Sequence, residues 1–267
     1  MDRSLDIVKT ELLLLVKKFH AFCINNDIYY SIHGGTMLGA VREKGFIPWD
    51  DDIDVTFIRE EYLKFEKAYN EKSMAGIKLS KTGFYPKLIM KRDNRPAVWM
   101  DIFIYDYITD NPIFRKYKIA RLKIFNLMFR DQGSLKFTKQ NSRGNWLRYL
   151  FVSMLVNYGN HTNREKLQRR AYRVMLSFPG NKNWLCRTND TIVGMPKIVP
   201  GYAMDKYELI QFEDTELMIS SYWDEILTVS YGKDYMTPRI TTDDQIHNAF
   251  IEKEIEYAEI DLKKIKD

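Results

Sequence analysis

Hydrophobic residues recur at intervals of three and four along the first part of the chain, as they do on the buried face of a helix. The positions that carry this pattern are Leu5, Val8, Leu12, Leu15, Phe19 and Phe22. They predict a helix over residues 4–25. Because Lys17 and Lys18 directly follow the short apolar run ELLLLV, this segment does not have the design of a secretion signal.

Beyond this helix, short apolar runs and period-two alternation become the main pattern. They predict strands over residues 28–32, 52–58, 77–81, 84–91 and 97–105, and helices over residues 36–42 and 59–71. This order is typical of a mixed sheet flanked by helices. The expected fold class is therefore α/β (α+β).

From Pro112 onward the pattern becomes helix-rich, which places a soft boundary near residue 111. The expected organisation is a core over residues 1–111 and a helix-rich C-terminal elaboration over residues 112–267. The stretch Asp131–Asn145 contains glycine and serine at several positions and is the best candidate for a mobile loop.

Two aspartates stand inside the apolar alternation of the strand predicted over residues 52–58. Side chains alternate between faces of a strand, so Asp52 and Asp54 point one way while Ile53, Val55 and Phe57 point the other way. Two carboxylates about 7 Å apart on one strand face can converge on one hard cation. Acidic residues at strand edges are commonly solvated turns, but a solvated turn would not show this alternation.

A glycine pair, Gly34 and Gly35, separates the first predicted strand from the helical turn Thr36–Arg42. Glycine lets backbone N–H groups approach a phosphate closely at such a helix start, although a glycine pair alone usually marks only a turn. Arg42 adds a planar fork of donors that suits phosphate oxygens. The conjunction of this turn with the aspartates predicts a phosphate site that includes Gly34, Gly35, Thr36 and Arg42.

A third acid, Asp101, lies in the alternating run WMDIFIYDY, where Met100, Ile102 and Ile104 occupy the opposite face. A buried aspartate without a partner is costly, so a metal or a cation accounts for it best. The alternative is a strand-edge aspartate that faces water.

The segment GGTMLGAVREKGFIPWDDDIDV resembles the signature of the LicD family, the bacterial phosphocholine transferases related to fukutin and fukutin-related protein, within the nucleotidyltransferase-fold superfamily. Further matching segments are WMDIFIYDY (99–107), FEDTELMI (212–219) and SYWDEILTVSYGKDYMTP (221–238). The resemblance covers roughly residues 1 to 250. It implies a nucleotidyltransferase-like core in which Asp52, Asp54 and Asp101 hold Mg²⁺ or Mn²⁺.

The same resemblance implies transfer of phosphocholine from CDP-choline to a sugar hydroxyl of a teichoic-acid or other cell-surface glycan precursor, with release of CMP. Asp101 or Asp50 is the candidate base for the acceptor hydroxyl. Lys87 and Lys91 share a strand face and are candidate phosphate contacts or, equally, a solvated lysine face.

A choline headgroup favours stacked aromatic rings. Three aromatic residues close to the acids in sequence are weak candidates for such contacts: Trp49, Trp99 and Tyr105. The C-terminal stretch departs from the family pattern, which often carries a Pro-Pro pair, and leaves Arg239 and His247 as weak candidates. Two other functions remain open: transfer of ribitol or glycerol phosphate on the same fold, and a non-catalytic nucleotide-binding module.

Composition and charge exclude several other classes of protein. A chain of 267 residues with 45% hydrophobic content is globular rather than disordered, and two cysteines with four histidines give no disulfide framework or zinc site, which favours the cytoplasm. The net charge of +5 could attract anionic substrates but is not typical of a nucleic-acid binder.

Basic and aromatic side chains mix over Phe114–Arg130, and Trp146–Tyr158 is almost entirely apolar. Such a combination occurs both in ordinary helices with a solvated basic face and in helices that lie on an anionic membrane. No apolar run is long enough to span a bilayer, so the expected location is cytoplasmic with a peripheral contact at the inner face of the membrane as an option.

Overall fold

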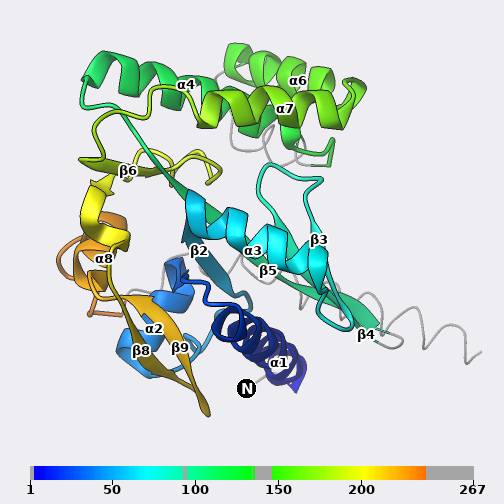
Figure 1. Ribbon diagram of the computed structural model, residues 1–267. Helices are drawn as coiled ribbons and strands as arrows, with labels where there is room; N and C mark the ends of the chain where they lie inside the picture. Colours follow the sequence, from blue (N-terminus) through cyan, green and yellow to red (C-terminus); the bar gives the residue numbers. More distant parts are fainter. Residues whose placement is uncertain (1–2, 93–94, 134, 136–145, 239–267) are drawn as a thin grey trace, which may run out of the picture. The chain divides into compact units, whose positions relative to one another are not determined.

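The computed structural model describes residues 3–92, 95–133, 135 and 146–238 (Figure 1). Close backbone contacts divide the chain into two compact units. Unit 1 comprises residues 1–80, 86–103 and 202–267, and unit 2 comprises residues 81–85 and 104–201. Strand β5 (Arg95–Tyr107) contributes its first nine residues to unit 1 and its last four to unit 2.

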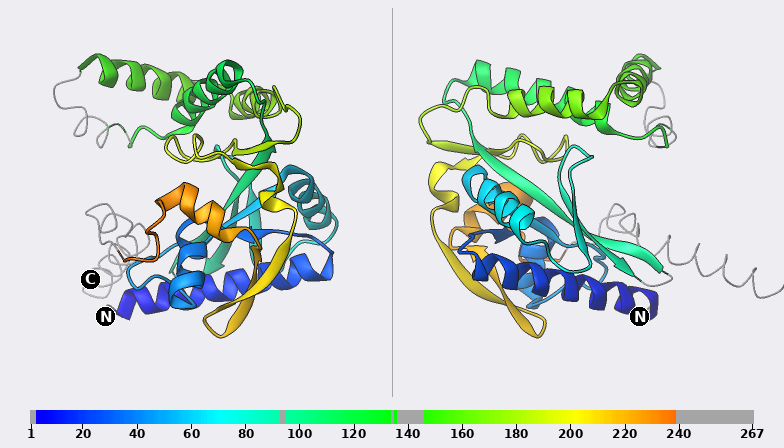
Figure 2. Two further views of the ribbon diagram at one scale, coloured as in Figure 1. Left: turned by 90° about the vertical axis from the view of Figure 1, so that its left-hand side faces the viewer. Right: turned by 45° about the vertical axis from the view of Figure 1, so that its right-hand side comes forward.

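Unit 1 combines a sheet with helices before and after it in sequence. Its other elements are α1 (Arg3–Asn25), β1 (Ser31–Ile32), α2 (Gly34–Glu43), β2 (Asp54–Ile58), α3 (Arg59–Glu71), β3 (Ile77–Ser80), β4 (Lys87–Arg92), β8 (Tyr207–Phe212), β9 (Thr215–Ser220) and α8 (Trp223–Tyr231). The strands follow the order β1-β2-β5-β4-β3, so β2, which carries Asp54, and β5, which carries Asp101, are direct neighbours. The hairpin of β8 and β9 forms a separate two-stranded sheet (Figure 2).

Aromatic rings form the core of unit 1, where α1, β2 and α3 meet. Phe19, Tyr30, Phe57 and Phe65 are all fully buried. The ring centroids of Phe19 and Tyr30 lie 4.7 Å apart, and those of Phe57 and Phe65 lie 5.4 Å apart. Such ring pairs contribute about 0.5–1.5 kcal/mol each beyond the burial of their area. The apolar stripe predicted for the first helix therefore packs against the buried side chains of β2, since the rings of Phe19 and Phe57 are in contact.

Unit 2 is built around three helices and a short strand pair. Its elements are the end of β5, α4 (Pro112–Phe129), α6 (Trp146–His161), α7 (Arg164–Met175), β6 (Trp184–Arg187) and β7 (Val199–Pro200), and a 3₁₀ turn follows at Gly201–Met204. Asn111 caps α4, because its Oδ1 accepts hydrogen bonds from the backbone N–H groups of Ile113 and Phe114. The core is a cluster of apolar side chains: Phe84, Leu122, Ala171, Val174, Met175 and Met195.

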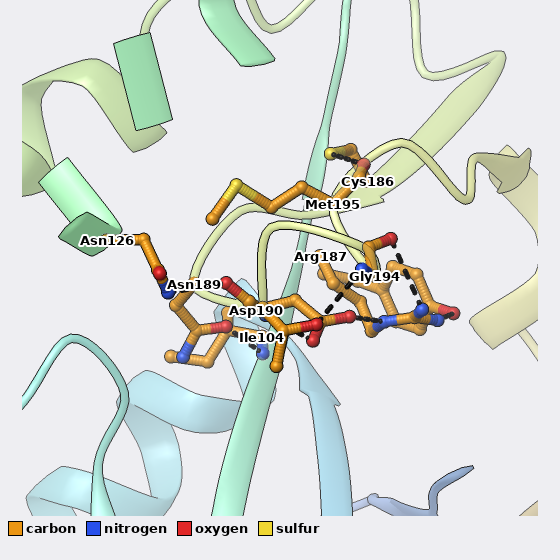
Figure 3. Close-up of polar contacts among 10 residues, drawn as sticks. Ile104, Asn126, Cys186, Arg187, Asn189, Asp190, Gly194 and Met195 are labelled. Carbon is orange, nitrogen blue, oxygen red and sulfur yellow. Dashed lines mark hydrogen bonds and ion pairs between the residues drawn. The ribbon is translucent and has the colours of Figure 1, made fainter. Parts of the chain in front are cut away.

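A buried polar network joins the loop after β6 to β5 within unit 2 (Figure 3). The Arg187 guanidinium donates from Nε to Asp190 Oδ2 at 2.5 Å and from Nη1 to the Tyr105 hydroxyl at 2.8 Å. Asn189 Oδ1 accepts from the backbone N–H of Ile104 at 2.7 Å. Because these groups are almost fully buried, the network fixes this loop only while every partner is present.

The α/β fold class predicted from the sequence is confirmed, and the helices predicted over residues 4–25 and 59–71 match α1 and α3 closely. The helix-rich region is present as α4, α6 and α7, but strands β6, β7, β8 and β9 were not predicted. The strand predicted over residues 28–32 is regular only at Ser31–Ile32. The predicted loop Asp131–Asn145 lies mostly outside the described residues, and the boundary at residue 111, which falls inside unit 2, stays a prediction.

Both cysteines, Cys23 and Cys186, are free and fully buried. Burial raises the pKa of the Cys23 thiol well above its usual range and raises that of Cys186 to about 12. Within the part of the chain that the structure describes, no helix has the length and apolar character needed to cross a bilayer.

The Arg187 network leads to a stability prediction. Replacement of Arg187 by Met leaves the Asp190 carboxylate buried without its cation, so we expect the free energy of unfolding to fall by about 3–5 kcal/mol. Lys67→Met is the matched control, because Lys67 pairs with Glu71 at 4.0 Å on the surface, and its loss should cost less than about 1 kcal/mol. Urea unfolding of both variants, followed by circular dichroism, measures the difference. Equal losses would contradict the structural role of the network.

Candidate functional site

Strand β2 begins at Asp54, and Asp52 lies in the loop just before it. Ile53, Val55 and Phe57 are buried, whereas Asp52 and Asp54 are half-buried. The strand predicted over residues 52–58 is regular only over Asp54–Ile58, and Thr56, which shares the face of Asp54, is buried as well. Within the strand, Asp54 points to the face opposite Phe57, which belongs to the aromatic core of unit 1.

The first turn of α2 is attached directly to the start of β2. The backbone N–H of His33 donates to the carbonyl of Asp54 at 2.9 Å, and the backbone N–H of Asp54 donates to Thr36 Oγ1 at 2.9 Å. Thr36 is buried, so its hydroxyl is committed to this contact and to the position of Asp54. The predicted phosphate-site residue Thr36 thus connects the glycine turn to the acidic strand.

The glycine pair makes room for two carboxylates. Gly34 has a φ of +56°, a conformation that L side chains rarely adopt, and a methyl group added there would lie 3.1 Å from Asp54 Oδ2. A methyl group added at Gly35 would lie 2.5 Å from Asp50 Oδ2. The positive end of the α2 dipole therefore lies next to two acidic side chains, which is favourable for both.

Asp101 enters the same region from the neighbouring strand. Its backbone N–H donates to the carbonyl of Ile53 at 3.1 Å, which sets Asp101 beside the residue that separates Asp52 from Asp54. Its carboxylate forms an ion pair with Lys87 Nζ at 2.7 Å, across the β4–β5 pairing. Burial raises the pKa of Asp101, and the Lys87 ammonium acts in the opposite direction.

The loop that carries Asp50 is held from both sides. Lys9 Nζ donates to the carbonyls of Ile47 and Pro48 at 2.9 Å each, and Glu213 Oε1 accepts from the backbone N–H of Phe46 at 2.8 Å. Burial raises the pKa of Asp50 to about 6, against the effect of its hydrogen bond with Asp52. The structure thus brings Asp50 together with Asp52 and Gly35.

Arg42 and the two predicted lysines are placed differently from one another. Arg42 pairs with Glu43 at 2.7 Å and donates from Nη1 to the carbonyl of Tyr235 at 3.5 Å. Lys87 forms the ion pair with Asp101 described above, whereas Lys91 is exposed. The roles of Arg42, Lys87 and Lys91 as phosphate contacts stay predictions.

The three aromatic candidates also differ. Trp49 is half-buried beside Asp50, and the Trp99 ring already faces a cation, because Lys87 Nζ lies 4.8 Å from its centroid. Tyr105 is fully buried in unit 2, where its hydroxyl accepts from Arg187. Tyr105 therefore has a structural contact in the core, and Arg239 and His247 lie outside the described residues.

The side chains around the glycine turn offer carboxylate oxygens, the ligands that Mg²⁺ prefers. Asp54 and Asp101 come from the adjacent strands β2 and β5, and Asp52 comes from the loop before β2, so the donor set fits the metal in its chemistry. Among residues 3–92, 95–133, 135 and 146–238, no three acidic, histidine or cysteine side chains are already gathered as a metal centre. The ligand roles of Asp52, Asp54 and Asp101 stay predictions.

One residue near the site was missed from the sequence. Tyr231 is the last residue of α8. Its hydroxyl lies 3.8 Å from the position that a methyl group on Gly34 would occupy, which is also close to Asp54 Oδ2. The sequence did give one indication of its importance, because Tyr231 lies in the segment SYWDEILTVSYGKDYMTP that carries part of the family resemblance. Nothing in its spacing pointed to the glycine turn, which is almost two hundred residues away in sequence.

The site lies inside a stretch that matches a known domain. Residues 27–120 match the model described as LicD/FKTN/FKRP, nucleotidyltransferase domain. This stretch is therefore similar to the nucleotidyltransferase domain of LicD-type proteins. The resemblance predicted from the signature at residues 34–55 is confirmed, and the glycine turn with Asp50, Asp52, Asp54 and Asp101 all fall within the matched span.

Curated relatives extend the similarity beyond this domain. A protein named lipopolysaccharide cholinephosphotransferase LicD, from Haemophilus influenzae, is 28% identical over 244 residues, which cover 84% of this chain and 88% of the relative. An uncharacterized protein of Rickettsia prowazekii is 31% identical over 132 residues, 42% of this chain and 47% of its own length. These similarities support a phosphotransferase of the LicD type, and an identity of 28% does not fix its donor.

The glycine pair gives a second prediction. Alanine is a better helix former than glycine, so Gly35→Ala should stabilise α2 if only helix propensity mattered. We expect it instead to lower the melting temperature by several degrees, because the added methyl group displaces the Asp50 carboxylate.

A double-mutant cycle with Asp50→Ala isolates this contact. The loss from Gly35→Ala should largely disappear in the Asp50→Ala background, which thermal melts of all four proteins would measure. An equal loss in both backgrounds would exclude the Asp50 side chain as the cause.

Proposed function

We propose that this protein is a Mg²⁺-dependent phosphocholine transferase. It moves phosphocholine from CDP-choline to a sugar hydroxyl of a teichoic-acid or other cell-surface glycan precursor and releases CMP. The proposal is carried by the acidic cluster at the glycine turn, and it is supported by the similarity over most of the chain to a protein named as a cholinephosphotransferase.

The reaction forms one phosphorus–oxygen bond and breaks another. The acceptor hydroxyl attacks the phosphorus that carries choline, the bond to the CMP oxygen breaks, and the hydroxyl proton leaves to a base. Mg²⁺ bound by Asp52, Asp54 and Asp101 would neutralise the diphosphate and stabilise the charge on departing CMP.

The residues of the chain position the donor. Backbone N–H groups of the first turn of α2 meet phosphate oxygens, and the helix dipole favours their negative charge. Thr36 holds β2 against this turn through its hydrogen bond with the Asp54 backbone N–H. Lys87 favours the ionised form of the half-buried Asp101 carboxylate, because its ammonium lies 2.7 Å away.

The choline headgroup requires an aromatic face and no hydrogen bond. Trp99 already faces the Lys87 ammonium, and Tyr105 is buried against Arg187. Trp49 is half-buried and directly precedes Asp50 in the sequence. Trp49 is therefore the best candidate for contact with the headgroup.

The first test measures CMP release from CDP-choline with and without Mg²⁺, with membrane glycan precursors as acceptor. Asp52→Asn and Asp54→Asn keep the shape of each side chain but remove its charge, so we expect each to lower kcat/KM about a thousandfold, equivalent to several kcal/mol of lost metal catalysis. Glu60→Gln is the control, since Glu60 is exposed on α3 and should leave the rate unchanged.

The same assay is repeated with CDP-ribitol and CDP-glycerol as alternative donors. Release of CMP from an alditol donor alone would overturn the choline assignment but retain the site, if it still requires Asp52 and Asp54. No CMP release from any donor, together with no Mg²⁺ binding in titrations, would support a binding module that has lost its catalytic activity.

Trp49 provides a separate test of donor recognition. We expect Trp49→Ala to raise the KM for CDP-choline about tenfold, because one cation–π contact is worth about 0.5–2 kcal/mol, with little change in melting temperature. Trp49→Phe keeps an aromatic face and should recover most of the affinity. A large drop in melting temperature with unchanged KM would identify Trp49 as structural.

A further inference from the structure

Helix α6 of unit 2 exposes an apolar face. Its members are large side chains that are each about half or more exposed: Trp146, Leu147, Leu150, Phe151, Met154 and Tyr158. Their spacing of three and four residues puts them together on one side of the helix. We refer to this set as the α6 face.

The opposite side of α6 is buried in the normal way. Val152, Leu155, Val156 and Gly159 pack toward α4 and α7, and the three helices lie side by side in Figure 1 and in both views of Figure 2. The helix therefore has one apolar side that packs against α4 and α7 and a second apolar side that faces water. Contiguous exposed apolar surface of this kind marks a binding surface.

Helix α7 borders the α6 face with positive charge. Arg170 donates from Nη1 to the Tyr158 hydroxyl at 3.4 Å, which joins one edge of the α6 face to α7. Lys166, Arg169 and Arg173 are exposed on the same helix, whereas Leu167, Ala171 and Val174 form its buried side. The exposed surface thus changes from apolar and aromatic to basic between neighbouring helices.

The charge of the chain is distributed unevenly. Helices α4, α6 and α7 contain eleven Lys and Arg residues and one acidic residue, Glu165, and of the basic residues only Lys118 is fully buried. The whole chain has 41 basic and 36 acidic residues, so the remainder has 30 basic and 35 acidic residues. The entire positive excess of the protein therefore lies on these three helices.

We propose that the α6 face docks on an anionic lipid bilayer, with the basic side chains of α7 on the phosphate headgroups. Trp, Tyr and Phe beside Arg and Lys are the side chains that favour the boundary between headgroups and acyl chains. At 16 residues α6 is about 24 Å long, shorter than the hydrocarbon core of a bilayer, so it lies in the plane of the interface. This surface is outside the matched domain and does not depend on the proposed function.

The experiment is flotation of the full chain with phosphatidylcholine vesicles that contain or lack phosphatidylglycerol. We expect binding to the anionic vesicles, weakened by salt. Leu147→Ser with Leu150→Ser should weaken it at least about tenfold, because two apolar side chains leave the interface. Arg169→Gln and Arg173→Gln should each weaken it about fivefold.

Matched controls use the other unit. Leu14 and Leu63 are exposed leucines on α1 and α3, and Lys18 is an exposed lysine on α1. Leu14→Ser with Leu63→Ser, and Lys18→Gln, should leave vesicle binding unchanged. Because all substituted positions are exposed, thermal melts should show that every variant is folded.

Two outcomes would overturn the proposal. The first is equal flotation with neutral and anionic vesicles, or none with either. The second is an α6 face that binds another copy of the chain: a dimer in analytical ultracentrifugation that Leu147→Ser with Leu150→Ser dissociates, without any vesicle binding.

Discussion

The architecture of the site depends on the space that two glycines leave at the start of α2. Asp54 and Asp50 lie where side chains on Gly34 and Gly35 would be, so a carboxylate cluster can form directly against a helix N-terminus. The favourable field of the helix and the hydrogen bonds between α2 and β2 offset the mutual repulsion of the acids. The surrounding elements, from Lys9 on α1 to Glu213 after β8, hold the intervening loop in this position.

The sequence predicted those parts of unit 1 that follow from periodicity. Ile53, Val55 and Phe57 are buried and Asp52 and Asp54 are half-buried, as the alternation predicts, although the regular strand begins only at Asp54. Tyr231 could not be found in this way, because its approach to Gly34 depends on the packing of α8 against α2. Local spacing contains no information about such a long-range contact.

Tyr105 illustrates the converse. Its position in an alternating strand next to Asp101 suggested the same site, but the final residues of β5 pair with β6 and are buried on both faces. Period-two alternation assigns faces only while one side of a sheet is solvated. The strands β6 to β9 were missed for a related reason, since short strands beside helix-rich segments give weak periodic signals.

The burial of both native thiols has a practical consequence. The thiolate is the form that reacts with alkylating reagents, and burial keeps Cys23 and Cys186 protonated and shielded. A single cysteine introduced at an exposed position would therefore be modified selectively. The natural sequence is already a suitable background for attaching one fluorophore or spin label, without the removal of any residue from its core.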